Sequence, residues 1–131
     1  MEANHPAQAL AYLGDAVFEL KVREMLLAQG ARPVDALNQA ARRYVTATAQ
    51  AAMYHRIAPL LTDEEQAILR RGRNLHGGRK MPNIADYRHA TGLETLFGYL
   101  HANGMHTRLA EVFALCTNEK SPSGPQDSKS P

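Results

Sequence analysis

The chain has 131 residues, of which 44% are hydrophobic and 21% are charged, and its formal net charge is only +2. This length suits one domain with its own core, and the composition excludes a disordered chain, while the weak positive charge alone does not identify a nucleic-acid-binding protein. We find neither an apolar run of the ~18 residues that a membrane-spanning helix needs nor a signal peptide, and the single cysteine, Cys116, excludes an internal disulfide, so we expect a cytoplasmic protein.

The first half of the sequence predicts two helices. The first ends near Gln29, with Gly30 as its C-cap. Its apolar stripe, at alternating spacings of three and four residues, consists of Leu10, Leu13, Val17, Leu20 and Leu27, with Glu24 taking one place. The second helix begins at Pro33, continues through the alanine-rich stretch to Ile57 and ends before Pro59.

The second half predicts three more helices. In LTDEEQAILRR, Thr62 and Glu65 have the spacing of a capping box at a helix start. Asn83 is a candidate cap of the next helix, which runs to about Asn103 and stops at Gly104. The core face of that helix consists of Leu93, Leu96, Phe97 and Leu100. The last helix has an apolar face formed by Leu109, Val112, Phe113 and Cys116.

The domain boundary follows from composition. No run of alternating residues favours a strand, so the fold class is all-α. We expect one domain at residues 1–117, followed by a polar, proline-rich tail at 118–131 that is disordered.

Two isolated carboxylates lie on apolar helices beside glycines. Asp15 follows Gly14 in LAYLGDAVFEL, residues 10–20, and Glu94 is the only charge in TGLETLFGYL, residues 91–100. Because hard oxygen ligands suit magnesium, which also binds phosphates, the two suggest a shared site for phosphodiester hydrolysis. Spacing alone leaves the alternative that each is an ordinary helix carboxylate, in the way that Glu19 can pair with Arg23.

A basic segment, RRGRNLHGGRK at residues 70–80, is the strongest charge feature. Its cations are Arg70, Arg71, Arg73, Arg79 and Lys80. They could bind phosphates, with glycines allowing close backbone approach, or the first two could only complement a helix C-terminus. The six histidines have no zinc-site spacing, and we expect Cys116 in the core rather than as a nucleophile.

Taken together, these segments resemble the ribonuclease III family. LAYLGDAVFELKVR resembles its signature helix, in the form found in Mini-ribonuclease III, the short bacterial branch without a double-stranded-RNA-binding domain. ARRYVTATAQA at 41–51, RRGRN at 70–74 and YRHATGLETLFGYL at 87–100 agree, in the family's order. The resemblance covers roughly residues 7–116.

The resemblance implies an all-helical, homodimeric endoribonuclease that cleaves double-stranded RNA with magnesium. Asp15 matches the aspartate of the family's LGD motif, and Glu94 matches the glutamate of the second signature helix. Two further carboxylates of the wider family are replaced here by Ala11 and Thr91, a reduced set that the Mini branch shares. We therefore expect metal-bound waters held in part by Thr91 and Glu19.

The resemblance also implies the partners. Two sites of a dimer would lie along one groove of an RNA helix, which is read by shape and phosphate. The residues expected to bind RNA are Arg70, Arg71, Arg73, Asn74, Arg79 and Lys80. The implied substrate is precursor large-subunit (23S) ribosomal RNA, with a ribosomal protein as a candidate helper. The alternative is a non-catalytic RNA-binding or ribosome-assembly module on the same fold.

Overall fold

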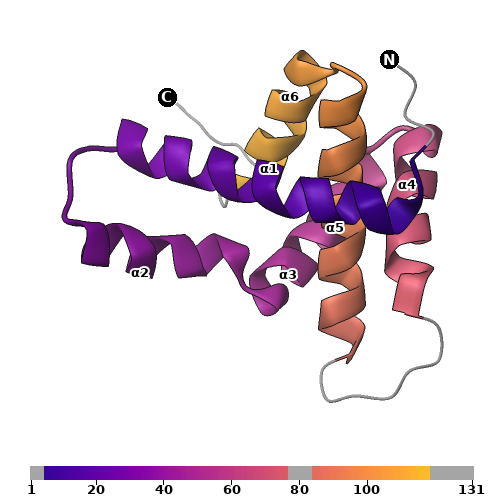
Figure 1. The fold of residues 1–131 in the computed structure, drawn as a ribbon, viewed down its shortest axis with the longest axis horizontal. Helices are drawn as coiled ribbons and strands as arrows, with labels where there is room; N and C mark the ends of the chain where they lie inside the picture. Colours follow the sequence, from indigo (N-terminus) through magenta and orange to yellow (C-terminus); the bar gives the residue numbers. More distant parts are fainter. Residues whose placement is uncertain (1–4, 77–83, 119–131) are drawn as a thin grey trace.

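The computed structural model describes residues 5–76 and 84–118 (Figure 1), which form six α-helices and two short 3-10 helices without a strand. In chain order these are α1 (Ala7–Ala28), α2 (Val34–Val45), α3 (Ala47–Ile57), η1 (Ala58–Leu60), α4 (Asp63–Arg73), η2 (Asn74–His76), α5 (Ile84–Ala102) and α6 (His106–Thr117). The all-α class is confirmed. Asn83, Arg79, Lys80 and all of the expected tail except Asn118 lie outside the described residues.

Helix α5 is the centre of the fold. It packs against α1, α3, α4 and α6, and Figure 1 shows α1 crossing it while α2 runs beside α1. The predicted core face of α5, Leu93, Leu96, Phe97 and Leu100, has no solvent exposure. None of the described helices combines the length and the apolar character that crossing a bilayer requires.

The predicted apolar stripe of α1 is wrong in its second half. Leu20 and Leu27 are 53% and 62% exposed. The core residues of this part of the helix are instead Phe18, Val22 and Leu26. These follow Gly14 at steps of four residues, so the buried face is fixed by the need to place Gly14 against α5.

The predicted long helix from Pro33 to Ile57 is also wrong, because it breaks at Thr46. The backbone of Thr46 is extended, with ψ of 157°, and its side chain accepts a hydrogen bond from the Ala49 amide at 3.2 Å. Thr46 is therefore the N-cap of α3. The break lets α2 pack on α1 while α3 turns to pack on α5 and α6.

The predicted helix start at Thr62 and the predicted stop at Gly104 are confirmed. At α4, Thr62 and Glu65 form the full capping box, with bonds of 3.0 and 3.1 Å. At the end of α5, Gly104 has a positive φ of 70°, and the bonds from Gly104 to His101 and from Met105 to Leu100 form a Schellman motif. This turn sends α6 back to cover the core with Leu109, Val112 and Cys116, while Phe113 is half-buried and packs edge-on against Phe18 and Phe97.

Candidate active site

The candidate site is built on an unusually close crossing of α1 and α5. A Cβ placed on Gly14 would lie 1.6 Å from the Glu94 carbonyl oxygen, and one on Gly98 would lie 1.9 Å from the Leu10 carbonyl oxygen. The two helix backbones are therefore in direct contact, which only glycine allows. Gly14 and Gly98 therefore have a structural role, because the close crossing that they allow brings Asp15 and Glu94 together.

Asp15 and Glu94 form a carboxylate pair. Asp15 is exposed on α1, Glu94 is partly buried on α5, and their side chains are hydrogen-bonded to each other. Burial, and next the negative charge of Asp15, raise the pKa of Glu94 from 4.5 to about 8. At neutral pH the pair therefore holds a proton that relieves the repulsion between the two carboxylates.

Gln50 is the member of this cluster that the sequence analysis missed. Its side chain is only 3% exposed, on α3, and donates a hydrogen bond to the Glu94 carboxylate that lowers the pKa of Glu94. The signal was present in the sequence, since Gln50 shares the helix spacing of the core residues Met53, Tyr54 and Ile57. A polar residue in such a stripe needs a partner in the core.

The two residues expected to hold metal-bound waters have other partners. The Thr91 hydroxyl donates to the Tyr87 carbonyl oxygen at 2.9 Å, and Thr91 is buried one turn before Glu94. Glu19 pairs with Arg23 at 3.0 Å, which is the alternative raised by their spacing. Their role as water-holding residues stays a prediction.

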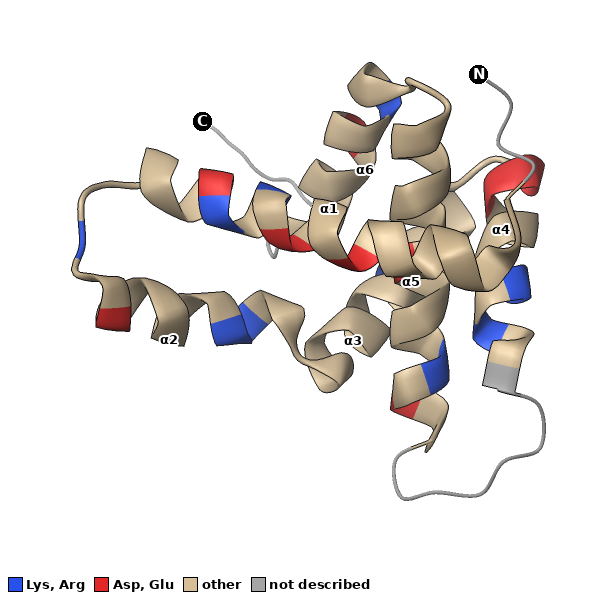
Figure 2. Ribbon diagram, viewed as in Figure 1, with Lys and Arg blue, Asp and Glu red and all other residues tan. Residues whose placement is uncertain are grey.

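The described part of the basic segment lies on a helix and not on a loop. Arg70, Arg71 and Arg73 form the basic last turn of α4, opposite its acidic first turn (Figure 2), and Asn74 is the C-cap, accepting a 3.2 Å bond from Arg73. Arg70, Arg71 and Asn74 are exposed, and Arg73 is half-buried.

This basic turn packs near the carboxylate pair. A Cβ on Gly72 would lie 2.2 Å from the Thr95 hydroxyl and 2.9 Å from the Cα of Gly92. Gly72 therefore places the last turn of α4 against the stretch of α5 that carries Glu94. The last turn of α4, which carries the arginines, and α1, which carries Asp15, therefore both pack on the stretch of α5 around Glu94.

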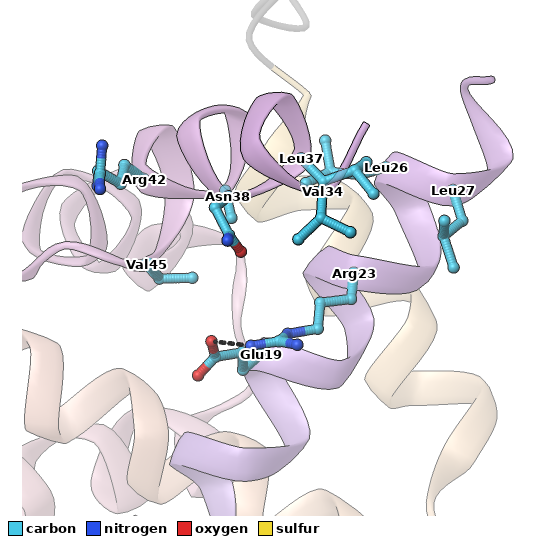
Figure 3. A pocket seen from close by; sticks show the side chains of 10 residues that line it. Glu19, Arg23, Leu26, Leu27, Val34, Leu37, Asn38, Arg42 and Val45 are labelled. Atoms are coloured by element: carbon cyan, nitrogen blue, oxygen red, sulfur yellow. Dashed lines mark hydrogen bonds and ion pairs between the residues drawn. The ribbon is translucent and has the colours of Figure 1, made fainter. Parts of the chain in front are cut away.

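A groove of about 450 Å³ lies between α1 and α2 (Figure 3). Its walls are Glu19, Arg23, Leu26 and Leu27 of α1 and Val34, Leu37, Asn38, Ala41, Arg42 and Val45 of α2. Figure 3 shows the Glu19–Arg23 ion pair on its α1 wall. The other polar side chains of this groove, Asn38 and Arg42, are exposed to solvent. Asp15 and Glu94 do not line the groove, so it is separate from the carboxylate pair.

Two other candidate chemistries are not supported. Cys116 is 1% exposed, and burial raises the pKa of its thiol to about 12, so the prediction of a core cysteine is confirmed. Within residues 5–76 and 84–118, no three His, Cys, Asp or Glu side chains gather in one cluster, so a metal centre held entirely by such side chains is absent from the described residues. A cation at the carboxylate pair would therefore have few direct protein ligands.

Known proteins agree with this fold and show the family of the chain. A model of the ribonuclease III domain matches residues 8–105, which include both carboxylates. The Mini-ribonuclease 3 of Symbiobacterium thermophilum is 50% identical over 109 residues, covering 82% of this chain and 84% of that protein. The Mini-ribonuclease 3 of Brevibacillus brevis is 45% identical over 105 residues, covering 79% and 78%.

Solved structures support the same conclusion about the fold. A crystal structure of a Fusobacterium nucleatum protein superimposes with a TM-score of 0.78 at 24% identity, covering 90% of this chain and 96% of that one. The helical fold, the crossing that joins Asp15 to Glu94 and the match over most of the chain lead to one identification. The chain is a member of the ribonuclease III family of endoribonucleases, and it belongs with the Mini-ribonuclease 3 proteins of that family.

Proposed function

We propose that the protein is a magnesium-dependent endoribonuclease in which Asp15 and Glu94 hold the metal ion and double-stranded RNA is the substrate. The observation that carries the proposal is the hydrogen-bonded pair of these two carboxylates at the glycine crossing of α1 and α5. Enzymes of the ribonuclease III family generally depend on divalent metals and act on double-stranded RNA.

The carboxylate pair fits a hard divalent cation. The pair presents oxygen ligands, and Asp15 gives it access to solvent. After burial, the negative charge of Asp15 is the next cause of the raised pKa of Glu94, and the same charge would favour a divalent cation that displaces the proton. Magnesium suits two carboxylates because it keeps several waters and takes ligands from phosphate.

The residues of this chain would have distinct roles in the reaction. Asp15 and Glu94 would fix the cation, which supplies charge stabilisation at the phosphodiester and an activated water. The basic last turn of α4 would hold phosphates of the same RNA and so fix its position relative to the carboxylates. Thr91, one turn before Glu94, and Glu19, one turn after Asp15, are the proposed water-holding residues.

The proposed substrate is the end region of precursor large-subunit (23S) ribosomal RNA, bound with or without a ribosomal protein. Its test is cleavage of a structured fragment of that RNA and of a plain duplex, each with magnesium or EDTA. We expect magnesium-dependent cuts by the wild type and none by Asp15→Asn. Cuts that persist in Asp15→Asn would contradict the proposed site. Binding without cuts by the wild type would favour the non-catalytic module.

The basic turn gives a separate prediction about RNA affinity. Replacing Arg70 and Arg71 with alanine should weaken RNA binding uniformly across sequences, and the salt dependence of log K should become shallower by about 0.9 per lost phosphate contact on a duplex. Both side chains are exposed, so the fold should be unaffected. The measurement is a filter-binding or fluorescence titration at several salt concentrations. An unchanged slope would show that the two arginines only complement the C-terminus of α4.

We also propose a homodimer formed through the exposed face of α1. This face carries the apolar side chains Tyr12, 85% exposed, Ala16, Leu20, 53% exposed, and Leu27, 62% exposed. Several exposed apolar side chains on one helix indicate an interface, although Arg23 and Glu24 separate Leu20 from Leu27. Because Asp15 lies next to this face on the same helix, such a dimer would bring two sites near one RNA.

The dimer predicts the effect of a charge on this face. Leu20→Asp should raise the dimer dissociation constant roughly 30-fold or more, since a truncated central contact costs about 2 kcal/mol or more. The measurement is the mass by light scattering over a concentration series. Leu60→Asp is the matched control, because Leu60 is 49% exposed but lies in η1, away from this face. Equal masses for the two variants would contradict this interface.

A further inference from the structure

The polar contact that Gln50 makes is unusual for its position on α3. Its neighbours at helix spacing, Met53, Tyr54 and Ile57, are all buried core residues. An apolar side chain of similar length would fill the same place without the cost of burying an amide. Packing alone therefore does not explain why an amide side chain occupies this position.

The reason is the partner of that amide. Gln50 donates a hydrogen bond to the Glu94 carboxylate, which also contacts Asp15. The Glu94 side chain is thereby held from two other helices, by α1 through Asp15 and by α3 through Gln50. Because Gln50 is 3% exposed, water does not compete for this bond and its direction is fixed by the packing of α3 on α5.

We propose that Gln50 is a positioning residue of the site, whose amide fixes the Glu94 carboxylate in the orientation that binds the divalent cation. This inference rests on the proposed function of Asp15 and Glu94. Ligand carboxylates in metal sites are commonly oriented by such hydrogen bonds, and loss of one typically costs 10- to 100-fold in metal affinity or activity. Gln50 does not touch the RNA or the cation in this assignment and acts only through Glu94.

The test replaces Gln50 with methionine, which has a similar length and no donor. Two quantities are measured on the purified full chain: the affinity for Mn²⁺ alone, by calorimetry, and the magnesium concentration that gives half-maximal cleavage. We expect Gln50→Met to weaken Mn²⁺ binding by roughly 10-fold or more and to raise the half-maximal magnesium concentration similarly. The melting temperature in EDTA should be unchanged or higher, because an apolar side chain suits the core.

Gln66 offers a matched control. Its side-chain amide is half-buried and donates to the backbone carbonyl oxygens of Ala58 and Leu61, at 2.7 and 3.5 Å, near the start of α4. Gln66→Met removes an amide with a purely structural role. It should lower the melting temperature while Mn²⁺ affinity and magnesium dependence stay at wild-type values. The two substitutions, which are chemically identical, should therefore have opposite signatures.

Each outcome decides the question. Wild-type Mn²⁺ affinity and magnesium dependence in a folded Gln50→Met would overturn the inference and leave Gln50 as a core amide. If Gln50→Met does not fold, Gln50→Asn carries the test, because it keeps an amide but withdraws it from Glu94 by one methylene. If the wild type itself neither binds Mn²⁺ nor cleaves RNA, it is the proposed function that fails, and this result is distinct from a failure of the inference alone.

Discussion

Glu94→Gln should abolish cleavage and at the same time stabilise the metal-free protein at alkaline pH. The substitution removes a negatively charged metal ligand, and losing several kcal/mol of charge stabilisation lowers the rate by about 10³-fold or more. It also removes a carboxylate that is partly buried beside Asp15. A side chain that is costly for folding and needed for activity is typical of a functional site.

The pH dependence follows from the direction of the pKa shift. The pKa of Glu94 is raised from 4.5 to about 8 in the folded protein. The folded state therefore binds this proton more tightly than the unfolded state. Its contribution to stability is fully present below about pH 4.5 and is lost as the pH rises through about 8.

Glu94→Gln replaces the titrating carboxylate with a neutral amide, so its stability does not fall as the pH rises through about 8. The wild type and the variant should therefore differ most at high pH. Near pH 9 in EDTA, the variant should be more stable than the wild type by roughly 1 to 3 kcal/mol, after allowance for screening by solvent at exposed Asp15. Near pH 5 the difference should be small. Added magnesium should reverse the order at high pH, because only the wild type has both carboxylate ligands.

The measurement is a set of chemical denaturation curves at several pH values, with magnesium or EDTA, alongside a cleavage assay. Glu111→Gln is the matched control: the same isosteric change at an exposed carboxylate on α6 that pairs with Arg108. The control should keep its activity. Cleavage by Glu94→Gln at the wild-type rate would show that Glu94 is not the metal ligand. A wild-type pH profile of its stability in EDTA would show that Glu94 is not the proton-holding group.

Local signals in the sequence predicted much of the fold. The capping box at Thr62, the stop at Gly104 and the core face of α5 are each determined by neighbouring residues, so sequence spacing was enough to find them. The pairing of Asp15 with Glu94 came from a different kind of signal. Each was a lone charge in an apolar helix beside a glycine, and the contact between them followed from the resemblance rather than from spacing.

The errors concern choices that only tertiary contacts determine. On α1, the spacing of Leu20 and Leu27 fits a buried helix face as well as the spacing of Phe18 and Val22 does. The close approach of α5 to Gly14 determines that the face with Phe18 and Val22 is the buried one. The break at Thr46 has the same origin, since both halves are good helix formers that pack on different helices. Gln50 was missed because its partner is 44 positions along the chain, at Glu94.

Gly14→Ala should be among the most damaging conservative substitutions in the chain. In an exposed helix interior this change stabilises by up to about 1 kcal/mol, because alanine loses less backbone entropy than glycine. Here the new Cβ would lie 1.6 Å from the carbonyl oxygen and 2.6 Å from the carbonyl carbon of Glu94. Both are backbone atoms of the central helix, so no side chain can rotate away to relieve the contact.

Relief must therefore come from separating α1 from α5. Separation would weaken the packing of Phe18 on Phe97, whose rings now lie edge-to-face at 5.2 Å, and would loosen the core around them. We expect a loss of roughly 3 kcal/mol, the upper end for overpacking, and a melting temperature lower by roughly 10 to 15 °C. Gly98→Ala should behave alike, since its Cβ would meet the Leu10 carbonyl oxygen at 1.9 Å. Ala9→Ser, on an exposed position of the same helix, is the control.

The same substitution separates the role of the crossing in folding from its role in the site. Under conditions where Gly14→Ala is still folded, Asp15 is displaced from Glu94 by the distance that the helices move apart. A displacement of about 1 Å can cost about 10²-fold in rate, so cleavage should fall by that factor in protein that circular dichroism shows to be helical. Mn²⁺ affinity should fall with it, because a cation must contact both carboxylates. If folded Gly14→Ala retains wild-type affinity and rate, the glycine crossing serves packing alone, and the close approach of α1 to α5 does not set the geometry of the carboxylate pair.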